Sequence, residues 1–395
     1  MTDVVVVGAG IVGLATARAL ADRGLAVTVV EKEGRVGVHQ TGHNSGVLHS
    51  GLYYRPGSLK ARLCVEGRRR MIEFCTEHGL PLDVSGKVVV ATDERQVTVL
   101  DELERRGRAN GLRGLRRLGP AELVEVEPYA TGLDALWVPE AGVVDFAAVA
   151  DRLAAGLAAD GAEVLTGRAV VGIVRTGGGI RVGTTAGPIS ARFLVNCAGL
   201  HSDRVARLAG VDPPVRIVPF RGDYYRLAAD ADRLVRALIY PVPDPRFPFL
   251  GVHFTRRIDG TVEVGPNAVL ALGREQYRGT RPNLGDLGEV LRYRGFWRIV
   301  RRYWRTGAAE LARSASRLTY AAAARTLVPA LGARDLRRAG SGVRAQAVDP
   351  AGTLVDDFVL VEGDAMVHVL NAPSPAATAS FAIGAHIADL AARHL

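Results

Sequence analysis

Residues 3–33, DVVVVGAGIVGLATARALADRGLAVTVVEKE, decide the fold because they run from a strand through a glycine turn and a helix into a second strand. Val4 to Val7 are apolar and β-branched, as expected for a strand buried on both faces. Leu14 to Arg23 have helical spacing, Gly24 ends that helix, and Ala26 to Val30 form the next strand. The opening of the chain therefore predicts a βαβ unit of a parallel sheet.

The turn of this unit has the spacing of a dinucleotide site. Gly8, Gly10 and Gly13 form GxGxxG directly between strand and helix. Such glycines permit the tight turn, a close approach of pyrophosphate and close helix packing, while the helix N-terminus offers N–H groups. Glu31 ends the second strand, where an acidic side chain accepts hydrogen bonds from a ribose diol. An ordinary glycine turn is the alternative, and the strand–turn–helix context favours a dinucleotide.

The segment after the unit favours FAD over a nicotinamide. Residues 39–54, HQTGHNSGVLHSGLYY, are rich in glycine and polar side chains and lead back toward the turn, which is unusual for a nicotinamide enzyme. No second GxGxxG follows for a reducing nicotinamide, which argues against a flavin monooxygenase.

Composition limits the remaining classes. The 395 residues are 48% hydrophobic and 23% charged, with a net charge of +9 and no apolar run of membrane-spanning length. The first residues lack the pattern of a secretion signal, so we expect a cytoplasmic protein. Three scattered cysteines argue against a disulfide framework or zinc site, and we expect no metal. No nucleic-acid module is present, and the arginine excess fits a solvated surface as well as an anionic ligand or membrane.

The order of expected elements predicts two interleaved subdomains. Helices are expected over 58–79, 95–127, 147–160 and 284–330, strands over 87–92, 135–146, 162–199 and 215–270, and a last strand over 365–370 before a C-terminal helix. We therefore expect an α/β fold: a two-dinucleotide-binding, Rossmann-like domain interleaved with an α+β substrate domain built on a mainly antiparallel sheet. The expected division is 1–86, 145–213 and 334–395 for the cofactor, and 87–144 and 214–333 for the substrate.

Several segments together resemble the L-2-hydroxyglutarate dehydrogenase/oxidase family of D-amino-acid-oxidase-like flavoproteins. The segments are the βαβ unit, residues 39–67, LVNCAGLHSDRVA (194–206), RIVPFRGDYY (216–225), 239–272, GVRAQAVD (342–349) and VLNAPSPAATAS (369–380). They span nearly the whole chain in the expected order. Departures are mild: Asp223 stands where family members often have glutamate, and 321–324 is an alanine run.

The resemblance implies FAD and a set of backbone-rich contacts to it. Small and polar residues suit backbone that lies against a flavin. Cys197 is most simply a small buried residue. The expected cofactor contacts are Gly8, Gly10, Ile11, Val12, Gly13, Glu31, Lys32, Thr41, Gly42, His43, Asn44, Ser45, Gly46, Val170, Cys197, Ala198, Gly199, Gly342, Ala372, Pro373, Pro375 and Ala376.

The resemblance also implies a substrate pocket. Arg344 is expected to follow the end of a strand and to hold a substrate carboxylate, with a surface ion pair as the alternative. His253 is expected to take the hydroxyl proton, and His49 is a second catalytic candidate, although both also suit structural roles. Expected substrate contacts are Tyr53, Tyr54, Arg221, Tyr224, Tyr240 and Ser374. Tyr53 and Tyr54 are equally plausible as core fillers, and Ser374, like Thr378, as a helix cap.

The expected activity is oxidation of L-2-hydroxyglutarate, or a close 2-hydroxy acid, by hydride transfer to the flavin. Oxygen, a quinone or another acceptor takes the electrons. An amine or amino-acid oxidase, a tailoring oxidase and a non-catalytic flavin protein are the alternatives. Residues 291–307 have helical apolar spacing with arginines between, which fits either a cap on the substrate domain or peripheral contact with the inner face of a membrane.

Overall fold

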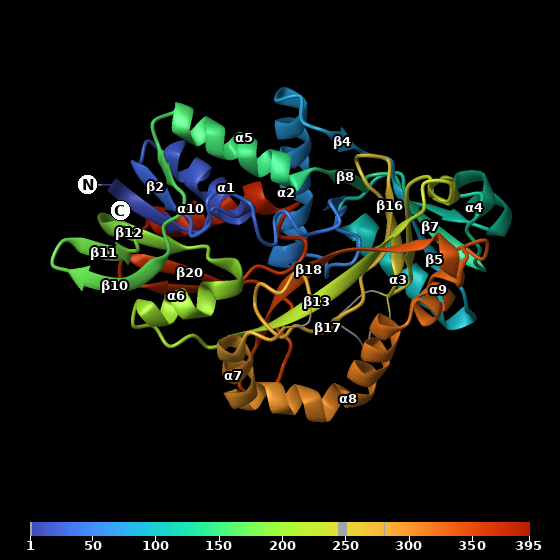
Figure 1. Ribbon diagram of the computed structural model, residues 1–395. Coiled ribbons are helices and arrows are strands. Elements are labelled where there is room, and N and C mark those ends of the chain that lie inside the picture. Colours follow the sequence, from blue (N-terminus) through green and yellow to red (C-terminus); the bar gives the residue numbers. More distant parts are fainter. Residues whose placement is uncertain (1, 244–250, 280) are drawn as a thin grey trace.

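The structure, a computed structural model, describes residues 2–243, 251–279 and 281–395. One sheet of eight strands forms the left half of the molecule in Figure 1. Its strands are β1 (Thr2–Val7), β2 (Val27–Val30), β9 (Glu163–Leu165), β10 (Val170–Thr176), β11 (Gly179–Thr184), β12 (Gly187–Asn196), β19 (Val359–Gly363) and β20 (Met366–Asn371). The order is β10-β11-β12-β1-β2-β9, with β20 beside β12 and β19 beside β20. The central β20, β12, β1, β2 and β9 run parallel.

Close helix packing covers this parallel sheet. Helices α1 (Ile11–Ala21), α5 (Phe146–Ala159) and α10 (Ser380–Ala392) share one apolar core with β1 and β2. A Cβ on Gly384 would lie 2.6 Å from the backbone carbon of Ala15, so the glycine lets α10 approach α1. The helix α6 (Ser202–Leu208) packs near β20 (Figure 1). The predicted βαβ unit is present, and α1 begins three residues earlier than the sequence predicts, with Gly10 as its N-cap.

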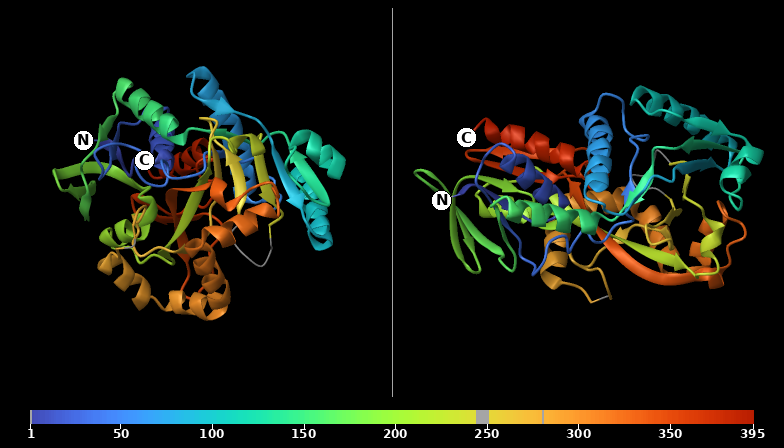
Figure 2. Two further views of the ribbon diagram at one scale, coloured as in Figure 1. Left: turned by 45° about the vertical axis from the view of Figure 1, so that its right-hand side comes forward. Right: turned by 90° about the horizontal axis from the view of Figure 1, so that it is seen from above.

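A second, mainly antiparallel sheet forms the other half (Figures 1 and 2). Its strands are β5 (Lys87–Ala91), β6 (Arg116–Leu118), β7 (Asp134–Val138), β13 (Arg216–Leu227), β14 (Leu238–Pro241), β15 (His253–Arg256), β16 (Val262–Gly265), β17 (Val269–Leu270) and β18 (Leu336–Val348). The order is β17-β13-β16-β15-β14-β5-β7-β6, and β18 pairs with β13. Only the β14–β5 pair is parallel among these described strands. The predicted α/β class, with a parallel and a mainly antiparallel sheet, is confirmed.

Smaller elements join the halves. The strands β3 (Val47–Leu48), β4 (Leu82–Asp83) and β8 (Gly142–Val144) form a three-stranded antiparallel sheet. Helices of the second half are α3 (Glu94–Ala109), α4 (Pro120–Val126), α7 (Leu284–Arg292), α8 (Arg294–Ala315) and α9 (Arg317–Arg325), and α2 (Leu59–Glu77) lies at the centre of Figure 1. No helix of the described chain is both long and apolar enough to cross a bilayer.

Three segments differ from the sequence predictions. The stretch 95–127 is not wholly helical, because β6 separates α3 from α4. The strand β19 is absent from the predictions. Residues 334–395 are expected in the cofactor subdomain, whereas β18 hydrogen-bonds along β13 in the second sheet. The other boundaries of the division remain predictions.

Candidate active site

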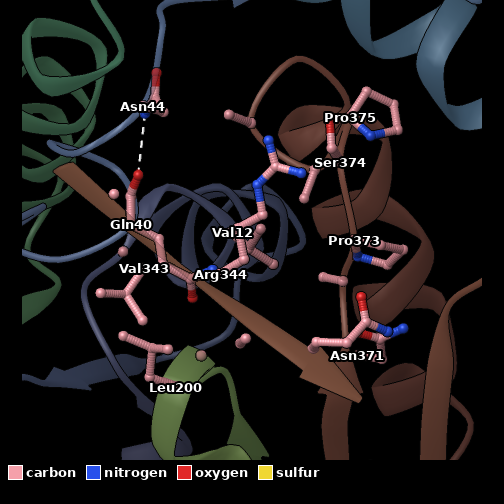
Figure 3. Close-up of a pocket in the computed structure, with 18 of the residues that line it drawn as sticks. Val12, Gln40, Asn44, Leu200, Val343, Arg344, Asn371, Pro373, Ser374 and Pro375 are labelled. Carbon is pink, nitrogen blue, oxygen red and sulfur yellow. Dashed lines mark hydrogen bonds between the residues drawn. The ribbon is translucent and has the colours of Figure 1, made fainter. Parts of the chain in front are cut away.

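A cavity of about 1370 Å³ runs between the two sheets. Its wall includes the glycine turn, the segment from Gly37 to Tyr54, the end of β12, the middle of β18 and the loop before α10. Figure 3 shows one part of this wall, where Val12, Asn44, Arg344 and Ser374 come together from segments far apart in the sequence.

The glycine turn shapes one end of the cavity. Gly8 has φ +102°, and a Cβ there would lie 2.6 Å from the carbonyl oxygen of Cys197. A Cβ on Gly13 would lie 2.0 Å from the carbonyl oxygen of Gly8. Gly10 differs, since its nearest neighbour would be the Thr41 hydroxyl at 3.5 Å. Gly8 and Gly13 therefore let the turn close on itself, while Gly10 leaves space on the cavity side for a ligand.

Glu31 stabilises the backbone at the glycine-turn end of the cavity. Its carboxylate accepts hydrogen bonds from the backbone N–H groups of Ala9 (2.8 Å) and Glu33 (2.9 Å), and it is 8% exposed. Thr41 Oγ1 accepts from the N–H of Ile11 at 3.0 Å, the first residue of α1. Glu31 lines the cavity at the end of β2 with lone pairs remaining, so a ribose diol can donate to it. The turn, the open Gly10 and Glu31 together fit a dinucleotide.

A charged cluster closes over this end from both halves. Glu275 lies after β17, and its carboxylate is 2.6 Å from the Lys32 ammonium and 2.6 Å from His201 Nε2. His201 and then Lys32 lower the pKa of Glu275 to about 2. Glu33 and His39 join the cluster, and Glu33, His39 and Glu275 have the ligand types of a metal site. The Lys32 ammonium already pairs with both carboxylates, so the cluster fits an ion-pair clamp better than a metal site.

His253 is a neutral base candidate at the other end. It begins β15, is 4% exposed and stacks on Tyr240 with ring centroids 4.0 Å apart. Its Nδ1 lies 2.8 Å from the carbonyl oxygen of Gly251. A carbonyl can only accept, so Nδ1 carries the hydrogen and Nε2 keeps a lone pair. Burial lowers the pKa of His253 to about 3, which keeps the ring neutral.

His49 is neutral for the same reason and is held by hydrogen bonds. Burial lowers its pKa to about 3, its Nε2 lies 3.3 Å from Ser374 Oγ, and its backbone N–H donates to Thr378 Oγ1. Since α10 begins at Ser380 and has no side-chain cap, Ser374 and Thr378 do not cap it. Their hydroxyls instead join the loop before α10 to residues 47–49.

Arg344 and Tyr224 share one face of the β13–β18 pair. Arg344 lies in the middle of β18 opposite Phe220, not after the end of a strand as the sequence predicts. Its side chain reaches toward Ser374 (Figure 3), and Tyr224 OH lies 3.3 Å from Ser45 Oγ. Both residues line the cavity. Arg344 is thus a cation on the same cavity as His253.

Arg221 does not reach this cavity. It pairs in the register with Val343, which lines the cavity (Figure 3), but Arg221 itself does not line it. Its guanidinium lies 2.9 Å from Asp223 and donates to the Gly279 carbonyl. These contacts hold the side chain away from the cavity lining in this structure, and its role as a substrate contact remains a prediction.

Two expected glycines face other backbone instead of the cavity. A Cβ on Gly42 would lie 2.8 Å from the carbonyl oxygen of Gly37, and one on Gly46 would lie 2.9 Å from that of Val144. Neither residue lines the cavity, so both shape the loop, and their roles as cofactor contacts remain predictions. Gly342 does line it, packed on the carbonyl oxygen of His43.

The other expected residues all line the cavity. These are Gly8, Gly10, Ile11, Val12, Gly13, Glu31, Lys32, Thr41, His43, Asn44, Ser45, Tyr53, Tyr54, Val170, Cys197, Ala198, Gly199, Tyr224, Tyr240, Gly342, Ala372, Pro373, Ser374, Pro375 and Ala376. The Asn44 amide holds its own loop, donating to Gln40 (Figure 3) and Thr41. Cys197 is a free thiol whose pKa burial raises to about 12, which argues against a redox role.

Sequence reasoning missed one cavity wall. The helix α3 contributes Arg95, Glu102 and Arg106 to the lining of the cavity, and α2 contributes Lys60. Asn110, after α3, donates to the carbonyls of Gly51 and Tyr54 at 2.9 Å and so fixes the tyrosine loop. A charged helix of this kind has the pattern of a solvent-facing one, so no local signal marks it.

Comparisons with known proteins support the same picture. The family model of FAD-dependent oxidoreductases (DAO) matches residues 3–390. The chain is 46% identical to an L-2-hydroxyglutarate dehydrogenase of Indibacter alkaliphilus, over 98% of both chains. It is 42% identical to the Escherichia coli L-2-hydroxyglutarate dehydrogenase over 98% of this chain and 92% of that one, and 43% identical to the human mitochondrial enzyme over 98% and 88%.

Solved structures agree on the fold. An L-α-glycerophosphate oxidase from Mycoplasma pneumoniae with FAD bound has a TM-score of 0.80 at 23% identity, covering 100% of this chain and 94% of that one. A glycine oxidase from Geobacillus kaustophilus has a TM-score of 0.73 at 20% identity, covering 100% and 95%. At these identities the likeness concerns the fold alone.

Proposed function

The chain belongs to the DAO family of FAD-dependent oxidoreductases, and we propose that it is an L-2-hydroxyglutarate dehydrogenase that forms 2-oxoglutarate. The observation that carries this proposal is the 46% identity over 98% of both chains to an enzyme of that name. The glycine oxidase likeness, at 20% identity, gives the amine-oxidase alternative no comparable support.

The residues of the dinucleotide end are the proposed FAD contacts. The glycine turn and α1 N-terminus would receive the pyrophosphate, and Glu31 the ribose. Bound FAD supplies a two-electron acceptor for the hydrogen on the hydroxyl-bearing carbon. Support comes from the open side of Gly10 and from the two backbone hydrogen bonds that fix the Glu31 carboxylate.

Arg344 and His253 are the proposed catalytic residues. A guanidinium binds a carboxylate through two parallel hydrogen bonds, which would fix the neighbouring carbon. The free Nε2 lone pair of His253 would accept the hydroxyl proton as the hydrogen leaves carbon. A pKa of about 3 makes a weak base, but a dianionic substrate beside the imidazole would raise that pKa. His49, held by Ser374, is the second candidate base.

An anaerobic titration of the purified holoprotein tests the proposal. We expect L-2-hydroxyglutarate to bleach the flavin absorbance, while the D enantiomer and L-glutamate leave it unchanged. Release of one 2-oxoglutarate for each flavin bleached, measured in the same samples, identifies the product. Faster bleaching by L-glutamate would contradict the assignment and favour an amino-acid oxidase.

We propose that the enzyme meets its electron acceptor at a membrane surface and that α8 binds this surface. Trp297, Trp304 and Leu311 lie seven residues apart and are 54%, 59% and 59% exposed, while Phe296 and Ile299 pack inward. Arginines flank the exposed stripe, and α8 lies at the lower edge of Figure 1. Exposed tryptophans with arginines suit an anionic bilayer surface. Arg302 and Tyr303 of α8 also line the cavity, so docking here would bring one cavity mouth to the membrane.

Vesicle sedimentation tests this contact. We expect the holoprotein to sediment with vesicles containing anionic phospholipid, and less with neutral vesicles or at high salt. The double variant Trp297→Ser/Trp304→Ser should lose at least about tenfold in vesicle affinity. Equal binding of the double variant and the parent protein would contradict the role of α8.

A further inference from the structure

Lys87 is a buried cation at the start of β5. It is 1% exposed, and its ammonium lies 4.5 Å from the ring centre of Tyr53 and 4.9 Å from that of Tyr240. Burial lowers the pKa of Lys87 to about 7. Of the described residues, Cys64 raises that pKa, but burial raises the pKa of the Cys64 thiol to about 12, so it carries no charge. Burying an ammonium group costs folding free energy unless an anionic group interacts with it, so we expect Lys87 to interact with an anion.

Lys60 is a second buried lysine beside a tyrosine ring, and it differs from Lys87 in its partners. Lys60 is also buried, at 7% exposure, and lies 5.1 Å from the ring centre of Tyr54. Its ammonium, however, is 2.7 Å from Asp356 Oδ1 and 2.8 Å from the Asp356 carbonyl. Lys60 thus has a carboxylate partner, whereas the recorded partners of Lys87 in the described chain are aromatic faces.

The two rings separate Lys87 from the candidate active site. Tyr53 and Tyr240 line the cavity, and Tyr240 stacks on His253. The Tyr53 hydroxyl is buried and has no hydrogen-bond partner among the described residues. The charge of Lys87 also helps to lower the pKa of both His49 and His253, so its field reaches the reacting end. A cation on a phenol ring makes its O–H a better donor to an anion.

We propose that Lys87, acting through Tyr53 and Tyr240, makes this cavity wall the subsite for a second carboxylate of the substrate and so selects diacids. Arg344 holds the carboxylate next to the hydroxyl, and the Tyr53 hydroxyl donates to the distal one. Lys87 is a positioning residue, since it does not itself line the cavity. This inference rests on the proposed function for the identity of the substrate.

Binding of an anion near Lys87 should change how much of the lysine is protonated. A buried amine that is only partly charged near neutral pH gains a proton when an anion binds nearby. The groups that face Lys87 are Cys64 of α2, His49 and Tyr53 of the loop, Tyr240 of β14 and His253 of β15. Binding of a diacid should therefore be accompanied by proton uptake that depends on Lys87.

The test uses holoprotein with Lys87→Met, which keeps the length and removes the charge. Binding of glutarate, a five-carbon diacid without the reactive hydroxyl, is measured by calorimetry in buffers of different ionisation enthalpy. We expect the parent protein to take up a fraction of a proton, and Lys87→Met to take up none and to bind glutarate about 100-fold more weakly. Valerate, with one carboxylate, should lose less than about threefold.

Two further variants complete the test. Lys87→Arg should recover most of the glutarate affinity without the proton uptake, because arginine stays charged. Val89→Ala, two residues along the same strand face, creates a small cavity without removing charge and should leave both readouts within about twofold. Equal losses for glutarate and valerate in Lys87→Met, or uptake unchanged by it, would overturn the proposal.

The test of Lys87 and the test of the proposed reaction can fail independently of each other. If L-2-hydroxyglutarate fails to bleach the parent flavin, the reaction assignment fails, yet glutarate binding and proton uptake still report on Lys87. If bleaching occurs and Lys87→Met slows it equally with L-2-hydroxyglutarate and L-2-hydroxyvalerate, the reaction stands and the diacid subsite is wrong.

Discussion

The two ends of the cavity are built in different ways. The dinucleotide end is formed mainly by backbone, because Gly8 and Gly13 have no room for a Cβ and Gly10 faces the cavity. At the other end, side chains from β13, β15, β18 and the segment before α2 converge. A backbone site fails through steric clash, whereas a side-chain site fails through lost charge or hydrogen bonds, so substitutions at the two ends should have different signatures.

The largest expected effect is at the glycine turn. In Gly13→Ala the new Cβ would lie 2.0 Å from the carbonyl oxygen of Gly8, so the turn must open. We expect the purified protein to lose FAD and its free energy of unfolding to fall by several kcal/mol. Flavin absorbance per protein and the melting temperature measure this.

Gly10→Ala is the matched control for the turn. Its Cβ has 3.5 Å to the nearest described atom, so the protein should fold with nearly unchanged stability in the absence of FAD. Its affinity for FAD should still fall, because the methyl group enters the ligand space. If both alanine variants bind FAD equally well, the steric description of this end is wrong.

At the side-chain end, the largest effect should come from Arg344. Arg344→Met removes the proposed carboxylate clamp, and we expect flavin reduction by substrate to fall about 10³-fold at unchanged FAD content. Arg221→Met is the comparison, because Arg221 lies on the neighbouring strand, pairs with Asp223 and does not line the cavity. Stopped-flow measurement should give less than about a tenfold loss for Arg221→Met, and equal losses would contradict the distinction between the two arginines.

His253 should have the next largest effect. We expect His253→Asn to slow flavin reduction about 100-fold with little change in substrate affinity, as for loss of a general base. If the rate of the parent protein falls at low pH because the base is protonated, this fall should be absent from the pH–rate profile of the variant. His49→Asn is the comparison, since His49 is the other neutral imidazole on the cavity. A larger loss in His49→Asn would transfer the base role to that residue.

The sequence predicts these two ends unequally for a physical reason. The turn and Glu31 lie within one βαβ unit, so local spacing determines their relative positions. Gly42, Gly46 and Arg221 do not line the cavity, although the sequence predicts ligand contacts for them, because whether a residue reaches a cavity depends on packing against segments far away in the sequence. On β13, for example, Tyr224 lines the cavity whereas Arg221 pairs with Asp223, and the sequence does not distinguish the two placements.

Other parts had no local signal at all. Arg95, Glu102 and Arg106 belong to a charged helix whose pattern does not distinguish a cavity wall from a solvated face. Lys87 precedes a run of valines, which predicts a strand but gives no indication that the lysine is buried between two tyrosines. Such placements follow from tertiary packing, which residue type and spacing do not determine.

The smallest expected effect concerns stability in acid. His49 and His253 each have a pKa of about 3 in the folded protein, below the value of 6.5 expected when unfolded. Between these values the unfolded chain binds more protons than the folded one, so the free energy of unfolding falls as the pH falls below about 6.5. Each histidine contributes up to about 1.4 kcal/mol per pH unit to this slope.

Urea unfolding at a series of pH values measures the slope. His253→Asn should reduce it between pH of about 6 and about 4, whatever the absolute stability of the variant, and should leave the curve above about pH 7 parallel to that of the parent. Slopes that remain equal in acid would mean that His253 takes up its proton in the folded protein near pH 6.5, as it does in the unfolded chain, so that burial does not lower its pKa. Above about pH 7 such an imidazole would still be neutral and would be a stronger base than the buried one, so the measurement tests the environment of His253 and the kinetics of His253→Asn test its role as the base.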